Sequence, residues 1–148
     1  MTSLPYASGF RELLVYQKSR ELSRMIFGLT ASFPKEEMYS LTDQIRHSSR
    51  SVGANLAEAW AKRRYEKHFL SKLTDADGEQ QETQHWIDTA VDCGYWTSEN
   101  ATTLRQKCEE IGRLLGGMMA KSEMFCSVLP REVCEHQAEY FVKNSEGQ

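Results

Sequence analysis

The sequence predicts an all-α protein, folded as an antiparallel up-and-down four-helix bundle with a C-terminal extension. Apolar residues recur three and four positions apart in four long segments, which is the period of a helix that buries one face. No segment alternates apolar and polar residues for long enough to indicate a strand. The connections between the four segments are short, and short connections favour antiparallel neighbours.

The first two predicted helices span about residues 10–31 and 40–62. The first ends before Pro34, because the residue ahead of a proline is pushed out of helical geometry. The second begins near Ser40, whose spacing to Asp43 resembles a capping box. The inward-facing stripe of the second helix consists of Ile45, Val52, Leu56 and Ala59.

The third predicted helix spans about residues 65–93 and ends at Gly94, a residue type that commonly stops a helix. The fourth begins after Thr97 or Ser98, either of which can cap it. Its apolar positions alternate steps of three and four, as in a coiled-coil seam. These positions are Ala101, Leu104, Cys108, Ile111, Leu115, Met118, Ser122 and Phe125. A second buried face is expected from the apolar residues beside the seam, which are Leu114, Met119 and Met124.

The length of 148 residues is typical of one domain, so one hydrophobic core is expected. We expect a disordered N-terminus over residues 1–9, the bundle over residues 10–129, and a short helix with a frayed tail over residues 130–148. The sequence begins with neither the basic stretch nor the apolar run of a secretory signal, and no window resembles a membrane span. We therefore predict a cytoplasmic protein without a membrane partner.

The residue types that usually hold metals or perform catalysis are present but poorly spaced. The four cysteines contain no Cys-x-x-Cys pair, which argues against both a zinc site and a redox motif. Glu82 and His85 supply one Glu-x-x-His, whereas a di-iron bundle needs that motif twice with two further Glu residues. No phosphate-binding loop or nucleophile elbow is present. We therefore predict no metal, no cofactor and no catalysis.

Charge is distributed unevenly along the chain, although the net charge is only −3. Residues 45–72 contain seven Lys and Arg against two Glu, whereas residues 73–110 contain two Lys and Arg against nine Asp and Glu. A basic segment attracts phosphates through charge and counterion release, which requires little fixed geometry. The residues predicted to bind RNA or DNA are Arg46, Arg50, Lys62, Arg63, Arg64 and Lys67.

Two aromatic residues beside this basic group, Trp60 and Tyr65, could stack on unpaired bases. The alternative interpretation is a solvated surface that pairs with the acidic third helix.

Polar residues flank the inward stripe of the second helix and predict a buried polar network. Paired carboxylates in such a network can shift each other's pKa and support chemistry. The favoured interpretation is a structural network that fixes the helix register, because buried polar groups must be hydrogen-bonded in any case. The predicted members are Gln44, Asn55, Glu58 and Glu82.

Several motifs between residues 10 and 118 resemble those of a known family. They are Phe33-Pro34 with Glu37 and Leu41 following, Gln44-Ile45-Arg46, Ser51-Val52 with Asn55-Leu56-Ala57-Glu58, Phe69-Leu70, Ala76-x-Gly78-x-x-x-Glu82, and Gly94-Tyr95. The chain is similar to the small bacterial four-helix bundle proteins encoded within intervening sequences of 23S ribosomal RNA genes. That family in turn resembles the accessory variability protein of diversity-generating retroelements. The chain departs from the family pattern at His47-Ser48-Ser49-Arg50, at Ala59 and at Glu79.

The resemblance implies a homopentamer, and it implies binding of nucleic acid and a reverse transcriptase for the retroelement members. We therefore expect an oligomeric accessory protein that binds RNA without catalysis. The alternative is a non-catalytic oligomeric scaffold that binds a protein partner. The apolar residues expected at the subunit interface are Leu14, Phe27, Leu114 and Met119.

Overall fold

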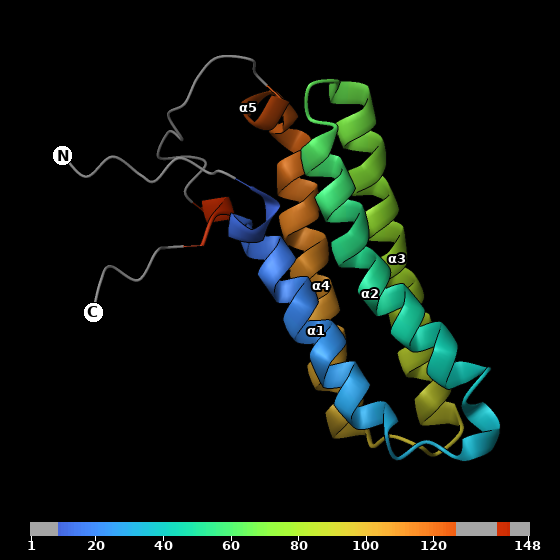
Figure 1. The fold of residues 1–148 in the computed structure, drawn as a ribbon. Helices are drawn as coiled ribbons and strands as arrows, with labels where there is room; N and C mark the ends of the chain where they lie inside the picture. Colours follow the sequence, from blue (N-terminus) through green and yellow to red (C-terminus); the bar gives the residue numbers. More distant parts are fainter. Residues whose placement is uncertain (1–8, 127–138, 143–148) are drawn as a thin grey trace, which may run out of the picture.

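Four long helices run side by side in the computed structural model, which describes residues 9–126 and 139–142 (Figure 1). Successive helices run in opposite directions, as short connections require. The long helices are α1 (Leu14–Thr30), α2 (Leu41–Ala61), α3 (Glu66–Asp92) and α4 (Ser98–Ala120). The predicted all-α bundle is confirmed.

Three shorter elements complete the described chain. A 3-10 turn precedes α1 at Phe10–Glu12, another precedes α2 at Lys35–Glu37, and helix α5 (Ser122–Cys126) follows α4. The described residues contain no strand, only an isolated bridge between Leu13 and Phe141. The disordered N-terminus predicted for residues 1–9 lies outside the described residues except for Gly9, as does most of the helix and tail predicted after residue 130.

Local chemistry explains where the helices begin and end. The hydroxyl of Thr97 accepts a hydrogen bond from the backbone N–H three residues on, at 3.2 Å, and caps α4 as predicted. Gly94 has a φ of +75°, a conformation that favours glycine, and it follows the end of α3. The capping prediction for α2 is wrong, because Ser40 makes no side-chain cap bond. Instead Glu37 Oε2 accepts from Leu41 N at 3.1 Å, where a carboxylate also suits the positive end of the helix dipole.

The hydrophobic core lies along the bundle axis, where the inward stripes of the helices meet. The predicted stripe of α2 is at most 1% exposed at each position, and the predicted seam of α4 is fully buried from Ala101 to Met118. Leu114, Met119 and Met124 are half-buried and pack against this core. The second apolar face of α4 is therefore only partly covered by the described residues.

Residues 139–142 return to the end of the bundle at which α1 begins. Val142 N donates a hydrogen bond to Glu12 O at 2.7 Å. Tyr140 is 6% exposed and packs on α4, where a Cβ at Gly117 would clash with its hydroxyl. This segment therefore closes over the apolar end of the bundle.

Candidate nucleic-acid interface

The six basic residues predicted to bind nucleic acid lie in two separate groups. Arg46 and Arg50 belong to the first half of α2. The corner between α2 and α3 carries the other four: Lys62, Arg63, Arg64 and Lys67. Arg50 and Lys62 are 12 positions apart, which is about 18 Å along a helix. The structure therefore brings the predicted residues together within each group but not as one cluster.

At the corner, Arg63 is held against the end of α2. Its guanidinium carbon lies 4.0 Å from the centroid of the Trp60 ring, and its Nη1 donates to Trp60 O at 3.0 Å. Trp60 also contacts Phe141, with ring centroids 6.3 Å apart. Trp60 is therefore a half-buried part of the fold, and the expectation that it stacks on bases is not supported by its position. Tyr65 is 61% exposed and keeps an accessible ring.

Arg46 and Arg50 lie against the last turns of α1, where an aromatic ring is exposed to solvent. Phe27 is 53% exposed, and the guanidinium carbons of Arg46 and Arg50 lie 4.6 and 5.7 Å from its centroid. Arg46 is fixed in place, because its Nε donates to Thr30 Oγ1 at 2.8 Å. A cation at the C-terminal end of α1 also suits the negative end of the helix dipole. Arg50 is exposed, and its side chain forms no hydrogen bond or ion pair with the described residues.

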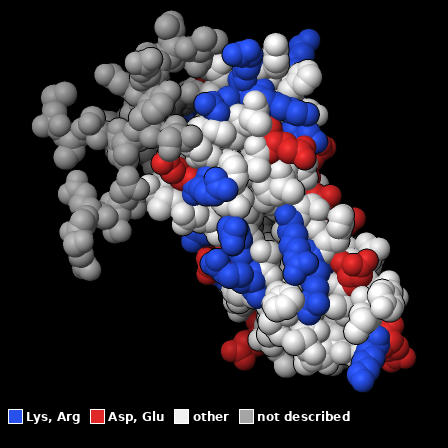
Figure 2. All heavy atoms as spheres, in the orientation of Figure 1, with Lys and Arg blue, Asp and Glu red and all other residues white. Residues whose placement is uncertain are grey.

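Two further arginines lie on the face of α1 that carries Phe27. Arg24 and Arg20 precede Phe27 by three and seven positions, so the three residues share one helix face. Sequence reasoning missed these two arginines, although the helical spacing to an apolar residue at the end of α1 is the signal that places them together. We define the arginine face by the five residues Arg20, Arg24, Phe27, Arg46 and Arg50. Figure 2 shows Lys and Arg side chains gathered over α1 and α2, and a second gathering at the end of the bundle near the α2–α3 corner.

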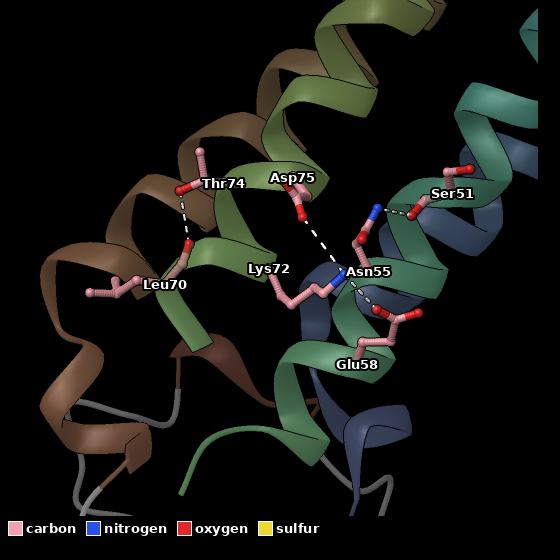
Figure 3. Close-up of polar contacts among 7 residues, drawn as sticks. All are labelled: Ser51, Asn55, Glu58, Leu70, Lys72, Thr74 and Asp75. Carbon is pink, nitrogen blue, oxygen red and sulfur yellow. Dashed lines mark hydrogen bonds and ion pairs between the residues drawn. The ribbon is translucent and has the colours of Figure 1, made fainter. Parts of the chain in front are cut away.

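The arginine face forms no ion pair among the described residues, although Asp43 lines a hollow with Arg46 and Arg50, and Glu21 lines another with Arg20 and Arg24. In the described part of the chain, none of its four guanidinium groups lies within 4.0 Å of a carboxylate. Other cations are paired: Lys72 lies 2.7 Å from Glu58 and 3.7 Å from Asp75 (Figure 3). The predicted pairing of basic residues with the acidic third helix thus holds for Lys72 but not for the arginine face.

The predicted buried polar network is wrong. Gln44, Glu58 and Glu82 are exposed, and Asn55 is half-buried with its Nδ2 donating to Ser51 O at 2.9 Å on its own helix (Figure 3). The physical reason is the rotation of both helices, because Gln44, Asn55 and Glu58 on α2 and Glu82 on α3 flank the buried stripes instead of joining them. Three of the four residues therefore lie at the surface, and Asn55 lies at its edge.

The buried polar contact between these helices is a pair of hydroxyl groups instead. Thr83 Oγ1 on α3 and Ser48 Oγ on α2 lie 2.9 Å apart, and both residues are fully buried. Thr83 Oγ1 also lies 2.8 Å from Glu79 O, and Ser48 Oγ lies 3.3 Å from Ile45 O. Both hydroxyls are satisfied, as buried polar groups must be.

Glu79 is a half-buried carboxylate of α3. Burial raises the pKa of Glu79, and the nearby charge of Glu82 raises that pKa further. Its Oε2 is buried without a hydrogen-bond partner, as is Nε1 of Trp86 two turns further along α3. In the described part of the chain, no three His, Cys, Asp or Glu side chains come together as a metal-binding group. No helix among the described residues is long and apolar enough to cross a membrane.

The fold and this surface define an all-α four-helix bundle with a cationic face. Residues 11–117 match the family described as 23S rRNA-intervening sequence protein, and the chain belongs to this family. The match ends at residue 117, so α5 and residues 139–142 lie beyond it.

A solved structure supports the same placement. The chain is similar to a protein of unknown function from the S23 ribosomal protein family of Bacteroides thetaiotaomicron, with 27% sequence identity and a TM-score of 0.65. The similarity covers 72% of this chain and 96% of the other. Among curated proteins no match was found. The relation to the retroelement accessory protein stays a prediction.

Proposed function

We propose that this member of the 23S rRNA-intervening sequence protein family is a non-catalytic accessory protein that binds RNA through its cationic surface. The observation that carries the proposal is the arginine face, where the guanidinium carbons of Arg46 and Arg50 lie 4.6 and 5.7 Å from the centroid of an exposed ring. Among the described residues, none of the four arginines of this face has a carboxylate within 4.0 Å. Arginines that have no acidic partner are free to replace the counterions of a phosphate backbone, and counterion release supplies most of non-specific affinity.

The α2–α3 corner is a second basic group, separate from the arginine face, and it adds three further cations. Lys62, Arg64 and Lys67 are exposed, and none lies within 4.0 Å of a carboxylate among the described residues. Arg63 is hydrogen-bonded to Trp60 O at the end of α2, so its guanidinium adds positive charge to the corner but is less free to move toward a phosphate. Phosphate contacts of this kind position a strand without reading its sequence, so the binding is sequence-tolerant.

The protein also acts as a homo-oligomer in this proposal, with five copies as the family resemblance implies. The partly covered apolar face of α4, with Leu114 and Met119, supports such an assembly. Phe27 lies beside Arg46 and Arg50, and its expected place in the interface stays a prediction, because aromatic and arginine residues are both enriched at protein interfaces. Several copies in one closed oligomer would raise a weak affinity for RNA through avidity. Light scattering coupled to size exclusion measures the mass, and a monomer at micromolar concentration refutes the assembly.

The test of RNA binding is a salt-dependent titration with Arg50→Glu and a matched control. Arg113→Glu changes the net charge equally, but Arg113 is an exposed residue of α4 that lines a shallow hollow with Asp77 and Glu109. We expect Arg50→Glu to weaken binding to all sequences alike and to reduce the salt slope by about 1 for each lost phosphate contact. The control should bind like the wild type.

Two outcomes would overturn the proposal. Equal weakening by Arg50→Glu and Arg113→Glu means that only net charge matters and that the arginine face is not the site. Absence of RNA and DNA binding at about 50 mM salt, where phosphate contacts are strong, favours a scaffold for a protein partner instead.

A further inference from the structure

We infer that the arginine face accepts single-stranded RNA in preference to duplex RNA, with one unpaired base stacked on Phe27. This inference rests on the proposed function and specifies the form of nucleic acid that the site takes. Phe27 is the ring around which this face is organised, and it remains 53% exposed despite two neighbouring guanidinium groups.

Two features hold the Phe27 ring in a defined position, the side chain that lies over it and the backbone that carries it. Arg46 lies over it and is itself anchored by the hydrogen bond to Thr30 Oγ1 on the next turn of α1. The backbone around Phe27 belongs to a regular helix. A fixed and half-exposed ring between cations is the arrangement that proteins use to stack bases of an unpaired strand while cations hold its backbone.

A hollow on α2 shares Arg46 and Arg50 with the surroundings of the ring and provides room for the backbone of the same nucleotide. It has a volume of about 330 Å³, near the lower end of the roughly 300–1,000 Å³ of small-ligand sites. Arg46 and Arg50 line the hollow and also lie over the Phe27 ring, and Thr42 and Ser51 line it as well. The residues that line it and bear charge or protons are Arg46, Arg50, His47 and Asp43, so cations outnumber the single carboxylate.

A duplex cannot use both parts of this surface at once. Its phosphates could reach the arginines, but its bases are stacked within the helix and present no free face to Phe27. An unpaired strand can place a base on the ring and a phosphate in the hollow together. The ring therefore confers a preference for single strands, whereas the arginines confer affinity for both forms.

The experiment compares Phe27→Leu and Phe27→Trp, using a short oligoadenylate strand and the same strand annealed to oligouridylate. Leucine keeps the apolar bulk but removes the ring, so affinity for the single strand should fall about tenfold while duplex affinity and the salt slope stay unchanged. Phe27→Trp restores a stacking surface and should bind the single strand as well as the wild type or better. Tyr39→Leu is the matched control, because Tyr39 is 88% exposed but outside the arginine face.

The outcomes separate this inference from the proposed function. Equal weakening of single-strand and duplex binding by Phe27→Leu, or no change in either, overturns the inference while RNA binding itself stands. A loss of both forms in Arg50→Glu supports the proposed function independently of the ring. If Phe27→Leu lowers the mass of the oligomer in light scattering, Phe27 belongs to a subunit interface and the inference fails.

Discussion

Replacing Ser48 with alanine and Thr83 with valine, singly and together, tests whether one buried hydroxyl pair joins α2 to α3. Each hydroxyl has a second acceptor on its own helix, Ile45 O at 3.3 Å for Ser48 and Glu79 O at 2.8 Å for Thr83. Neither single substitution therefore leaves a buried donor without a partner. The loss in each case is that of one neutral hydrogen bond between helices, about 1 kcal/mol.

The expected free energies follow from this geometry. Alanine has a better helix propensity than serine by about 0.5 kcal/mol, so Ser48→Ala should cost about 0.5 kcal/mol in all. Thr83→Val gains no such compensation and should cost about 1 kcal/mol. Once one hydroxyl is gone, removal of the other breaks no further bond between the helices. The double variant should therefore lose about 0.5 kcal/mol instead of the sum of about 1.5, which is a coupling of about 1 kcal/mol.

Urea unfolding followed by circular dichroism measures the free energy of unfolding of all four proteins. Ser23→Ala with Thr74→Val is the control cycle, because these exposed hydroxyls donate to carbonyls of their own separate helices. Its coupling should be zero within about 0.5 kcal/mol. A coupling of the same size in both cycles, or a cost above about 3 kcal/mol for Ser48→Ala alone, would refute the reasoning.

Three further predictions follow from single positions. Gly117→Ala should destabilise the protein by about 1–2 kcal/mol in thermal melts, because the new Cβ would lie 3.1 Å from Cζ of Tyr140. This cost exceeds the gain in helix propensity from glycine to alanine. Gly116→Ala is the control and should not destabilise the protein, because a Cβ at Gly116 would meet open space. Glu79→Gln should raise the melting temperature at pH 7, because burial raises the pKa of Glu79 above its ordinary 4.5 and ionisation therefore opposes folding. The gain should vanish below about pH 4, where the wild-type carboxyl is also neutral, and a gain independent of pH would contradict this cause. Burial raises the pKa of Cys108 to about 12, so at about pH 8 alkylation detected by mass spectrometry should modify the exposed Cys93 and spare Cys108 until the protein unfolds.

The helices could be predicted from the sequence because each carries its own signals. The stripe from Ile45 to Ala59 repeats with the period of a helix, and Pro34 and Gly94 act on the chain within a few residues of themselves. Such signals depend little on tertiary structure, so the predicted bounds agree with α1 to α4 within a few residues, apart from the first few residues before α1 and the far end of the fourth helix.

The polar contact between α2 and α3 depends on rotation, which the sequence specifies less well. Consecutive helix residues point about 100° apart, so a small rotation decides whether a residue at the edge of a stripe is buried. Asn55 and Glu58 lie at that edge and turn outward. Ser48 lies inside the stripe, three residues after Ile45 and four before Val52, and that spacing is the signal which identifies it.

The candidate site was predicted in part for a similar reason. The charge of Arg46 and Arg50 is evident along the chain, but these two arginines meet Phe27, on the face of α1 that also carries Arg20 and Arg24, only because α1 packs beside α2. The covering of Trp60 depends on residue 141, far away in sequence. Contacts between distant segments carry no local pattern, so they escape prediction from periodicity and charge.

The closure of residues 139–142 over the start of α1 has a consequence for the order of folding. Val142 and Glu12 are 130 positions apart, whereas each helical hairpin of the bundle joins neighbouring segments. The entropy lost in closing a loop grows with its length, so the hairpins should assemble first and this pairing last. The contact between residues 139–142 and the start of α1 should also be the first to open in the native protein, because contacts at the end of a bundle separate at a lower free energy than contacts in the core. The N–H of Val142 should then exchange its hydrogen well before the amides in the middle of α4, and the end of the bundle near Phe125 would open to solvent while the four helices stay packed.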